Sequence, residues 1–466
     1  MNFSVFIKEK LFYVQLAILF ALSVVFAYER ILNVDNSLAF FNIVNSKIFN
    51  FPEFRVGVVF TQIPLMLGAL LHLPLKMLVY LYSITFPLLY IFIFFICYHL
   101  LKNTEAAICL LLSLCICTAQ SFFHPVTETH QAIAFSCLLY AVISSGQISN
   151  TIIKYLLTCC IIILCLLTHP VALFTVLFVL IFSFINHSGQ KDRVFYFSAV
   201  IVTFLFSLIR FLASTKGYDA EQYEQLKNFK NILPVFFSLY PVLFIKIHFI
   251  ELYLSATILF LLSECYFLYS KKIIHALLLA VSVIGFVCIS IITFNKGDAD
   301  MMMEKSFMPA AFMICLCFTY IITLVNFKSY MHNISYIFIH FILIISFIRI
   351  IPGGKIFTTR INYLDRIITY AEMIKSPKLI FNPSNLNKDI LINNWGFSLD
   401  LLILSACDKK QITTAYIADD KELRHFQLGD KYLFLWWPVL DQRALDTAYF
   451  NLQTTPYVIV NKFLKL

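Results

Sequence analysis

Apolar runs of membrane-spanning length recur from the N-terminus to about residue 350. They occupy 11–27, 58–72, 77–101, 106–120, 131–146, 151–168, 170–186, 194–214, 231–248, 249–270, 273–294, 307–327 and 333–352. An apolar run of about eighteen or more residues can cross the hydrocarbon core of a bilayer as a helix. The pattern therefore predicts a polytopic α-helical membrane protein.

The polar loops between these runs predict how the chain is threaded, because cytoplasmic loops carry an excess of Lys and Arg. Strict alternation from a cytoplasmic N-terminus places several basic loops outside. The conflict disappears if one short segment between 58 and 120 does not fully cross, and if 231–248, with Pro234 and Pro241, does not either. About eleven spans then remain.

This threading divides the loops into two groups. The basic loops face the cytoplasm: 187–193, 270–272 and 327–333. The other polar loops share the outer side: 28–57, 121–130, 168–170, 215–230 and 295–305. We therefore expect any site built from these outer loops to lie at one membrane face.

The composition changes after residue 352. Residues 353–466 hold all three Trp and many charges, with short β-like runs at 412–417 and 457–460. We predict two domains: a transmembrane domain over 1–352, and a small soluble α+β domain over 353–466 on the outer side.

Composition narrows the class of protein further. Only 13% of the residues are charged, against about a quarter in soluble domains, and the net charge of +9 comes mainly from Lys and Arg in loops and in the tail. That placement indicates membrane orientation and no nucleic-acid partner. Most of the 13 Cys lie in apolar segments, where a thiol acts as a small hydrophobic group.

The first outer loop, 28–57, holds the densest charge in the first hundred residues. A helical pattern there (Leu38, Phe41, Val44, Ile48) predicts a helix lying along the membrane interface. Asp35, near its start, could act as a general base, and an ordinary helix-capping Asp is the alternative.

Two arginines of the same loop supply positive charge. Arg55, with Arg30, could bind phosphate oxygens through its planar guanidinium, and reaching toward lipid headgroups is the alternative. His169, beside Pro170, and Lys305, at the start of a span, are further candidates for substrate binding.

The second outer loop carries His124, Glu128 and His130 within seven residues. Such a group could hold a divalent metal ion, or bind phosphate and sugar hydroxyls. The alternative is a polar turn at the membrane boundary, where polar groups cost less than at the bilayer centre. The sequence names no other cofactor.

The layout resembles the GT-C class of membrane glycosyltransferases, which use polyprenyl-phosphate-linked sugars. The likeness lies in Asp35 within ERILNVDNSLAFF, in the Gln62-Ile63-Pro64-Leu65 start of the next apolar run, in Glu128 within HPVTETH, and in the C-terminal domain. It implies catalytic roles for Asp35 and Glu128. The chain departs from the class where Asn36 follows Asp35, since an Asp-Glu pair is common there.

The resemblance implies an integral glycosyltransferase of the inner membrane, with a periplasmic C-terminal domain. The donor would be a polyprenyl-phosphate sugar, and residues 355–466 could dock an envelope protein. Two alternatives stay open: an envelope polysaccharide transporter or polymerase, and a non-catalytic membrane subunit. The scarcity of charges inside the spans disfavours an ion-coupled transporter.

Overall fold

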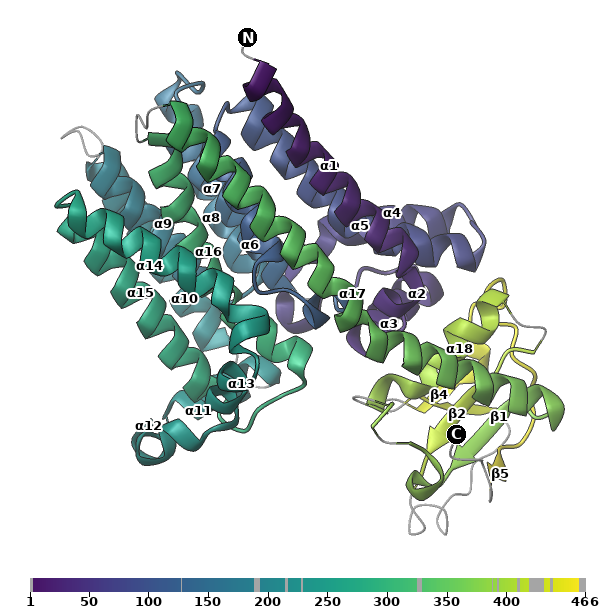
Figure 1. Cartoon of the computed structure of the whole chain (residues 1–466). Coiled ribbons are helices and arrows are strands. Elements are labelled where there is room, and N and C mark those ends of the chain that lie inside the picture. The colour runs from purple at the N-terminus through teal and green to yellow at the C-terminus, as the bar shows by residue number, and fades with distance from the viewer. Residues whose placement is uncertain are drawn as a thin grey trace.

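The chain folds into a helical bundle joined to a small mixed domain (Figure 1). The computed structural model describes residues 3–126, 128–187, 193–213, 217–227, 229–324, 329–387, 389–391, 394–408, 411–418, 431–435 and 439–460. In Figure 1 the N-terminus lies at one end of the bundle, and the mixed domain lies toward the other.

Long apolar helices form the bundle. Within the described residues, eight helical stretches are long and apolar enough to span a membrane: Leu75–Leu100, Thr151–Thr168, Arg193–Leu212, Phe229–Ile247, Phe249–Tyr269, Ile273–Thr293, Asp300–Thr323 and Ile334–Met373. Four shorter apolar helices are Lys10–Val25, Val56–Leu70, Thr104–Cys115 and Ala172–Asn186. The protein is therefore a multi-pass helical membrane protein. The predicted total of about eleven spans lies between these eight and the twelve reached with the shorter helices.

The helices around the polar end have these bounds: α1 Phe3–Val25, α2 Ala27–Ile31, α3 Asp35–Ser46, α4 Val59–Leu70, α5 Leu75–Phe95, α6 Thr104–Cys115, η4 Gln120–Phe123, α7 Glu128–Ser144, α8 Thr151–Thr168, α9 Ala172–His187, α10 Arg193–Ala213 and α11 Tyr218–Lys227. The later helices are α12 Phe229–Ile232, α13 Tyr240–Ile247, α14 Leu254–Tyr269, α15 Ile273–Thr293, α16 Asp300–Leu324, α17 Ser329–Met373 and α18 Phe397–Asp408.

The irregular segments lie where the charge pattern predicts them. Between 58 and 120, α4 and α6 each have 12 residues, about 18 Å of helix against a hydrocarbon core of about 30 Å. Two segments are therefore short there, where one is predicted. The 231–248 segment is broken into α12, the 3-10 helix Leu233–Ser238 and α13, and its prolines lie near the start of the last two pieces.

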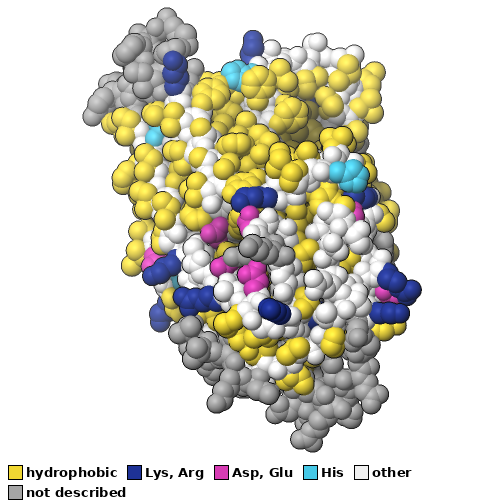
Figure 2. Space-filling model, turned by 90° about the vertical axis from the view of Figure 1, so that its right-hand side faces the viewer, with side chains coloured by type: hydrophobic (Ala, Val, Ile, Leu, Met, Phe, Trp, Pro, Cys, Tyr) yellow, Lys and Arg dark blue, Asp and Glu magenta, His cyan; other side chains and the backbone are white. Residues whose placement is uncertain are grey.

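Contacts bring the predicted outer loops to one end of the bundle. Asp35 meets His124, Arg55 meets Asp219, and Asn295 donates a hydrogen bond to Gln225. Figure 2 shows hydrophobic side chains over most of the upper half of one face, with most of the acidic and basic ones in its lower half. These contacts place the loops together at one end of the bundle. Of the basic loops, 188–192 and 325–328 lie outside the described residues.

The predicted interfacial helix is α3, but protein covers it. Phe40, Phe41 and Val44 are buried, and the ring of Phe41 lies 5.3 Å from that of Phe450 in the C-terminal domain. Ile48 lies beyond the end of the helix and is exposed. The apolar pattern alone could not show whether lipid or protein covers the apolar face of this helix.

One helix, α17, continues past the change in composition at residue 352. α17 runs unbroken for 45 residues through Pro352, Gly353 and Gly354. The strands β1 Lys378–Phe381, β2 Thr414–Ile417 and β5 Val458–Val460 then form a parallel sheet in the order β2-β1-β5, with Ile380 between Tyr416 and Ile459. A second pair, β3 Tyr432–Phe434 and β4 Val439–Asp441, is antiparallel. The β-like runs predicted at 412–417 and 457–460 are therefore strands.

Buried charges dock this domain on the membrane part. Arg360 of α17 lies 2.6 Å from Asp400 of α18, and both side chains are almost fully buried. Arg360 also donates to the carbonyl of Leu32, at 3.0 Å, just before α3. At the other end of α3, Lys47 pairs with Asp446 at 2.7 Å. Arg360 of α17 therefore holds one end of α3, and Asp446 of the C-terminal domain holds the other.

Candidate functional site

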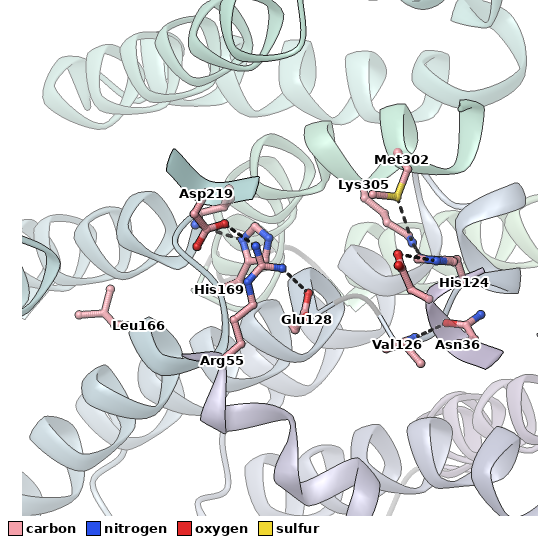
Figure 3. A network of polar contacts seen from close by, with 12 residues as sticks. Asn36, Arg55, His124, Val126, Glu128, Leu166, His169, Asp219, Met302 and Lys305 are labelled. Atoms are coloured by element: carbon pink, nitrogen blue, oxygen red, sulfur yellow. Dashed lines mark hydrogen bonds and ion pairs between the residues drawn. The ribbon is translucent and has the colours of Figure 1, made fainter. Parts of the chain in front are cut away.

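Three polar side chains form a row from α3 to α16. The Nε2 atom of His124 lies 3.3 Å from Oδ2 of Asp35, and its Nδ1 atom hydrogen-bonds the Lys305 amine (Figure 3). When Lys305 carries its proton, its ammonium only donates, so Nδ1 of His124 accepts and the ring proton lies on Nε2, toward Asp35. The row thus fixes the orientation of the His124 ring.

The charges along this row follow from burial and neighbours. Burial, with the positive charge of Lys305, lowers the pKa of His124 to about 4 against the opposing pull of Asp35. Burial by itself would raise the pKa of Asp35, but the contact with His124 and the charges of Lys305 and Arg55 hold it below its ordinary value. At pH 7 Asp35 is a carboxylate, and nearly half of its side chain is exposed.

A second cluster surrounds Arg55. Its Nη1 lies 2.8 Å from Glu128 Oε2, and its Nη2 lies 2.5 Å from Asp219 Oδ1. Arg210 reaches the other oxygen of Asp219 at 3.4 Å and also donates to the carbonyl of Leu166. Burial alone would lower the pKa of Arg55, but the two carboxylates raise it. Figure 3 shows His169 beside this cluster.

A cavity of about 480 Å³ joins this cluster to the membrane-facing helices. The charged side chains in its lining are Arg55, Glu128, Arg210, Asp219 and Lys305, and His169 lies among them. Most of its remaining wall is apolar, including Phe174, Phe204, Phe211 and Phe286. Phe204 and Phe211 are themselves about half exposed on the outside of the bundle. The cavity therefore runs from an apolar surface to a charged inner end.

Lys305 connects the cavity to the row of Asp35. Its side chain is buried, lines the cavity, and contacts His124 and the sulfur of Met302. Among the residues that the structure describes, no carboxylate pairs with its amine within 4.0 Å. Burial opposes a charge on this amine, and an anion as its neighbour would stabilise the charged form.

Two side chains hold the segment that carries His124. Glu304, next to Lys305, accepts hydrogen bonds from the backbone N–H groups of 119, 120 and 121 at 2.9, 3.0 and 2.7 Å. Asn36, next to Asp35, accepts from the N–H of Val126 at 3.2 Å and donates to the carbonyl of Phe123 at 3.3 Å. Glu304 and Asn36, which are next to Lys305 and Asp35 in sequence, therefore fix the backbone on both sides of His124.

The predicted cluster of His124, Glu128 and His130 is divided among three places. His124 meets Asp35, Glu128 meets Arg55, and His130 lines a separate small cavity with Arg30. In the described part of the chain, no group of three or more His, Cys, Asp or Glu side chains could hold a metal ion. These three residues therefore do not form one metal site.

Sequence reasoning missed Asp219, Arg210, Asn36 and Glu304. Asp219 belongs to a loop correctly placed on the polar face, and Arg210 is a rare charge near the end of a span. Those signals could have suggested that Asp219 and Arg210 belong to a site. They could not have shown which residues the two contact, because Arg55 and Asp219 are 164 residues apart.

No family model, no curated protein and no solved structure matches this chain. The fold and the site therefore define its class by themselves. It is a multi-pass helical membrane protein with a charged site at one end, next to a cavity that reaches the membrane-facing surface.

Proposed function

We propose that this protein is an inverting glycosyltransferase that moves a sugar from a polyprenyl-phosphate donor to a hydroxyl of an envelope acceptor. The observation that carries the proposal is the cavity, whose apolar walls lead to Lys305 and so to the row that ends at Asp35. An apolar path with an unpaired cation at its end fits a lipid that carries one phosphate. Asp35 lies where a hydroxyl could be deprotonated.

The donor would lie with its first prenyl units against Phe174, Phe204 and Phe211 and with its phosphate at Lys305. Arg55 and Arg210 are less suited to the phosphate, because Glu128 and Asp219 already neutralise them. In this assignment the Arg55 cluster shapes the inner end of the cavity. Glu128 orients Arg55, and no metal role is given to it.

In the reaction, the acceptor oxygen attacks the anomeric carbon while its proton passes to Asp35. The bond from that carbon to the phosphate oxygen breaks, and its electron pair leaves on the lipid phosphate. Lys305 stabilises the developing charge there, and a buried site strengthens this contact relative to water. His124 positions Asp35 and, being neutral, does not compete with Lys305 for the phosphate.

The proposal includes the orientation of the protein in the inner membrane, with the N-terminus in the cytoplasm and the C-terminal domain in the periplasm. A phosphatase reporter fused to the C-terminus tests it, because that enzyme is active only outside the cytoplasm. An inactive but well-expressed fusion would contradict the orientation.

The test of function uses purified protein in lipid vesicles with a panel of labelled polyprenyl-phosphate hexoses and pentoses. For a productive donor, Asp35→Asn should lower kcat by about 10²–10⁴-fold, the usual contribution of a general base. The control is Asp441→Asn in the C-terminal domain, whose partner Arg443 is exposed, and this variant should retain full activity. Full activity of Asp35→Asn would refute this role of Asp35, and no transfer from any donor would favour a non-catalytic subunit.

A further inference from the structure

Arg30 and His130 meet in a cavity that the proposed reaction does not use. The cavity has about 30 Å³ of space, and its polar lining includes Arg30, Ser121 and His130. Lys305, Asp35 and Glu128 do not line it. A space of this size holds one water molecule or one monatomic ion.

Arg30 brings a buried positive charge to this cavity without a carboxylate. Its side chain is 3% exposed and donates to the Ser83 hydroxyl at 3.0 Å, to the Ser83 carbonyl at 3.4 Å and to the Phe122 carbonyl at 2.5 Å. A guanidinium has five N–H groups, so these bonds leave donors over. Among the described residues, no Asp or Glu pairs with Arg30, and Glu128 is already paired with Arg55.

The other side of the cavity offers an unsatisfied histidine. His130 is buried, and its Nδ1 atom has no hydrogen-bond partner among the residues that the structure describes. The charges of Arg30 and Lys305 both act on this ring, so the surroundings are positive. Burial lowers the pKa of Arg30 to about 9, and the guanidinium therefore remains charged at pH 7.

We infer that this cavity binds a small monovalent anion, with chloride as the physiological ligand. Arg30 supplies the charge, and His130 donates through Nδ1–H. The anion compensates a buried charge that neutral groups alone satisfy only in part. Water fits the space as well, but it would leave the positive charge of Arg30 uncompensated.

Such an anion would stabilise the segment that carries His124. Arg30 donates to the carbonyl of Phe122, and the ring of Phe122 lies 4.2 Å from its guanidinium carbon. His124 follows two residues later and faces Asp35. Bound anion should therefore be seen first as greater stability of the folded protein, because it binds the native state only.

The experiment is thermal unfolding of the full-length protein in detergent, with sodium chloride titrated against sodium gluconate at constant ionic strength. We expect Tm to rise with chloride and to saturate. The rise should vanish in Arg30→Gln and persist in the exposed Arg193→Gln. Equal Tm values in chloride and gluconate for the unchanged protein would overturn the inference and leave water as the occupant.

A second measurement keeps the inference testable if Arg30→Gln does not fold. Crystals of the unchanged protein grown in sodium bromide should give an anomalous peak between Arg30 and His130. Diffraction that is strong enough to show bromide elsewhere, with no peak in this cavity, would overturn the inference. Neither measurement involves sugar transfer, so the anion site and the proposed function can fail separately.

Discussion

Asp35 owes its protonation state to neighbours that come from distant parts of the chain. Burial would favour the neutral acid, but the contact with His124 and the charges of Lys305 and Arg55 keep it ionised. A general base must be unprotonated before it can act. His124 and Lys305 therefore matter to Asp35 even if neither touches the substrate.

The pH dependence of transfer tests this relation. His124→Asn should raise the pKa of Asp35, because burial then meets less opposition, and should move the acidic limb of kcat/KM to higher pH. In the unchanged protein this limb should lie below about pH 4, the ordinary Asp value. His72→Asn, at an exposed turn with φ of 53°, is the control, since Asn tolerates that conformation. An acidic limb that stays in place in His124→Asn would contradict the proposed contact.

The buried ion pairs of Arg55 contribute to the stability of the folded protein. Arg55→Gln leaves Glu128 and Asp219 buried with a weaker positive partner, and the free energy of unfolding should fall by about 3–5 kcal/mol. Lys47→Gln breaks the pair with Asp446, which is about a quarter exposed, and should cost at most about 1 kcal/mol. Chemical unfolding in detergent measures both variants. An equal fall in the free energy of unfolding for both variants would contradict the expectation that the buried pairs of Arg55 stabilise the protein more than the Lys47 pair.

At the scale of elements, α17 packs closely on the segment that carries His124. A Cβ atom added to Gly354 would lie 2.4 Å from Cζ of Phe123, and one added to Gly353 would lie 3.0 Å from the backbone carbon of Ala119. The two glycines after Pro352 therefore allow α17 to pack closely against residues 119–123. From the sequence alone, Pro-Gly-Gly predicts the end of a domain.

The two helical glycines Gly354 and Gly285 form a matched test. Gly354→Ala should destabilise the protein and reduce transfer, because the stacked rings of Phe123 and Phe357 would have to move. Gly285→Ala in α15 meets nothing within 4 Å, so it should be neutral, or stabilising by up to about 1 kcal/mol. The Tm and the transfer activity of both variants, each compared with the unchanged protein, test this expectation. A neutral Gly354→Ala would mean that the close contact is not needed.

At the scale of the whole molecule, the C-terminal domain is part of the support of the site. Arg360 and Asp400 form a buried pair between α17 and α18, and Arg360 also holds the carbonyl of Leu32 before α3. Because Asp35 is the first residue of α3, a shift of this domain would move Asp35 relative to His124.

Breaking that pair should loosen the domain. Arg360→Met leaves Asp400 buried without its counter-ion, and the expected loss is about 3–5 kcal/mol. The double variant Arg360→Met with Asp400→Leu removes both charges and should recover part of that stability. Thermal unfolding, with limited proteolysis of the C-terminal domain, measures both variants. A double variant less stable than the single one would contradict this account.

The sequence by itself determined the class of protein and predicted that the polar loops of the site lie together. Apolar runs predict membrane helices because a bilayer demands length and low polarity, which are local properties. The charge pattern of the loops predicts that Asp35, Glu128 and Lys305 lie on one side, and their contacts place them at one end of the bundle. The strands β2 and β5 follow from local β-like runs in the same way.

Only the tertiary structure decided which side chains meet. His124, Glu128 and His130 are close in sequence, but one lies in an irregular segment and two lie on different faces of α7. His124 therefore contacts Asp35, Glu128 contacts Arg55, and His130 lines a cavity together with Arg30. Partners such as Lys305 for His124, 181 residues away, depend on how the helices pack. The cover of α3 by the C-terminal domain depends on packing as well. The protonation states of Asp35, His124 and Arg55 depend on how deeply each side chain is buried and on which charged groups contact it, and both depend on the packing of the whole chain.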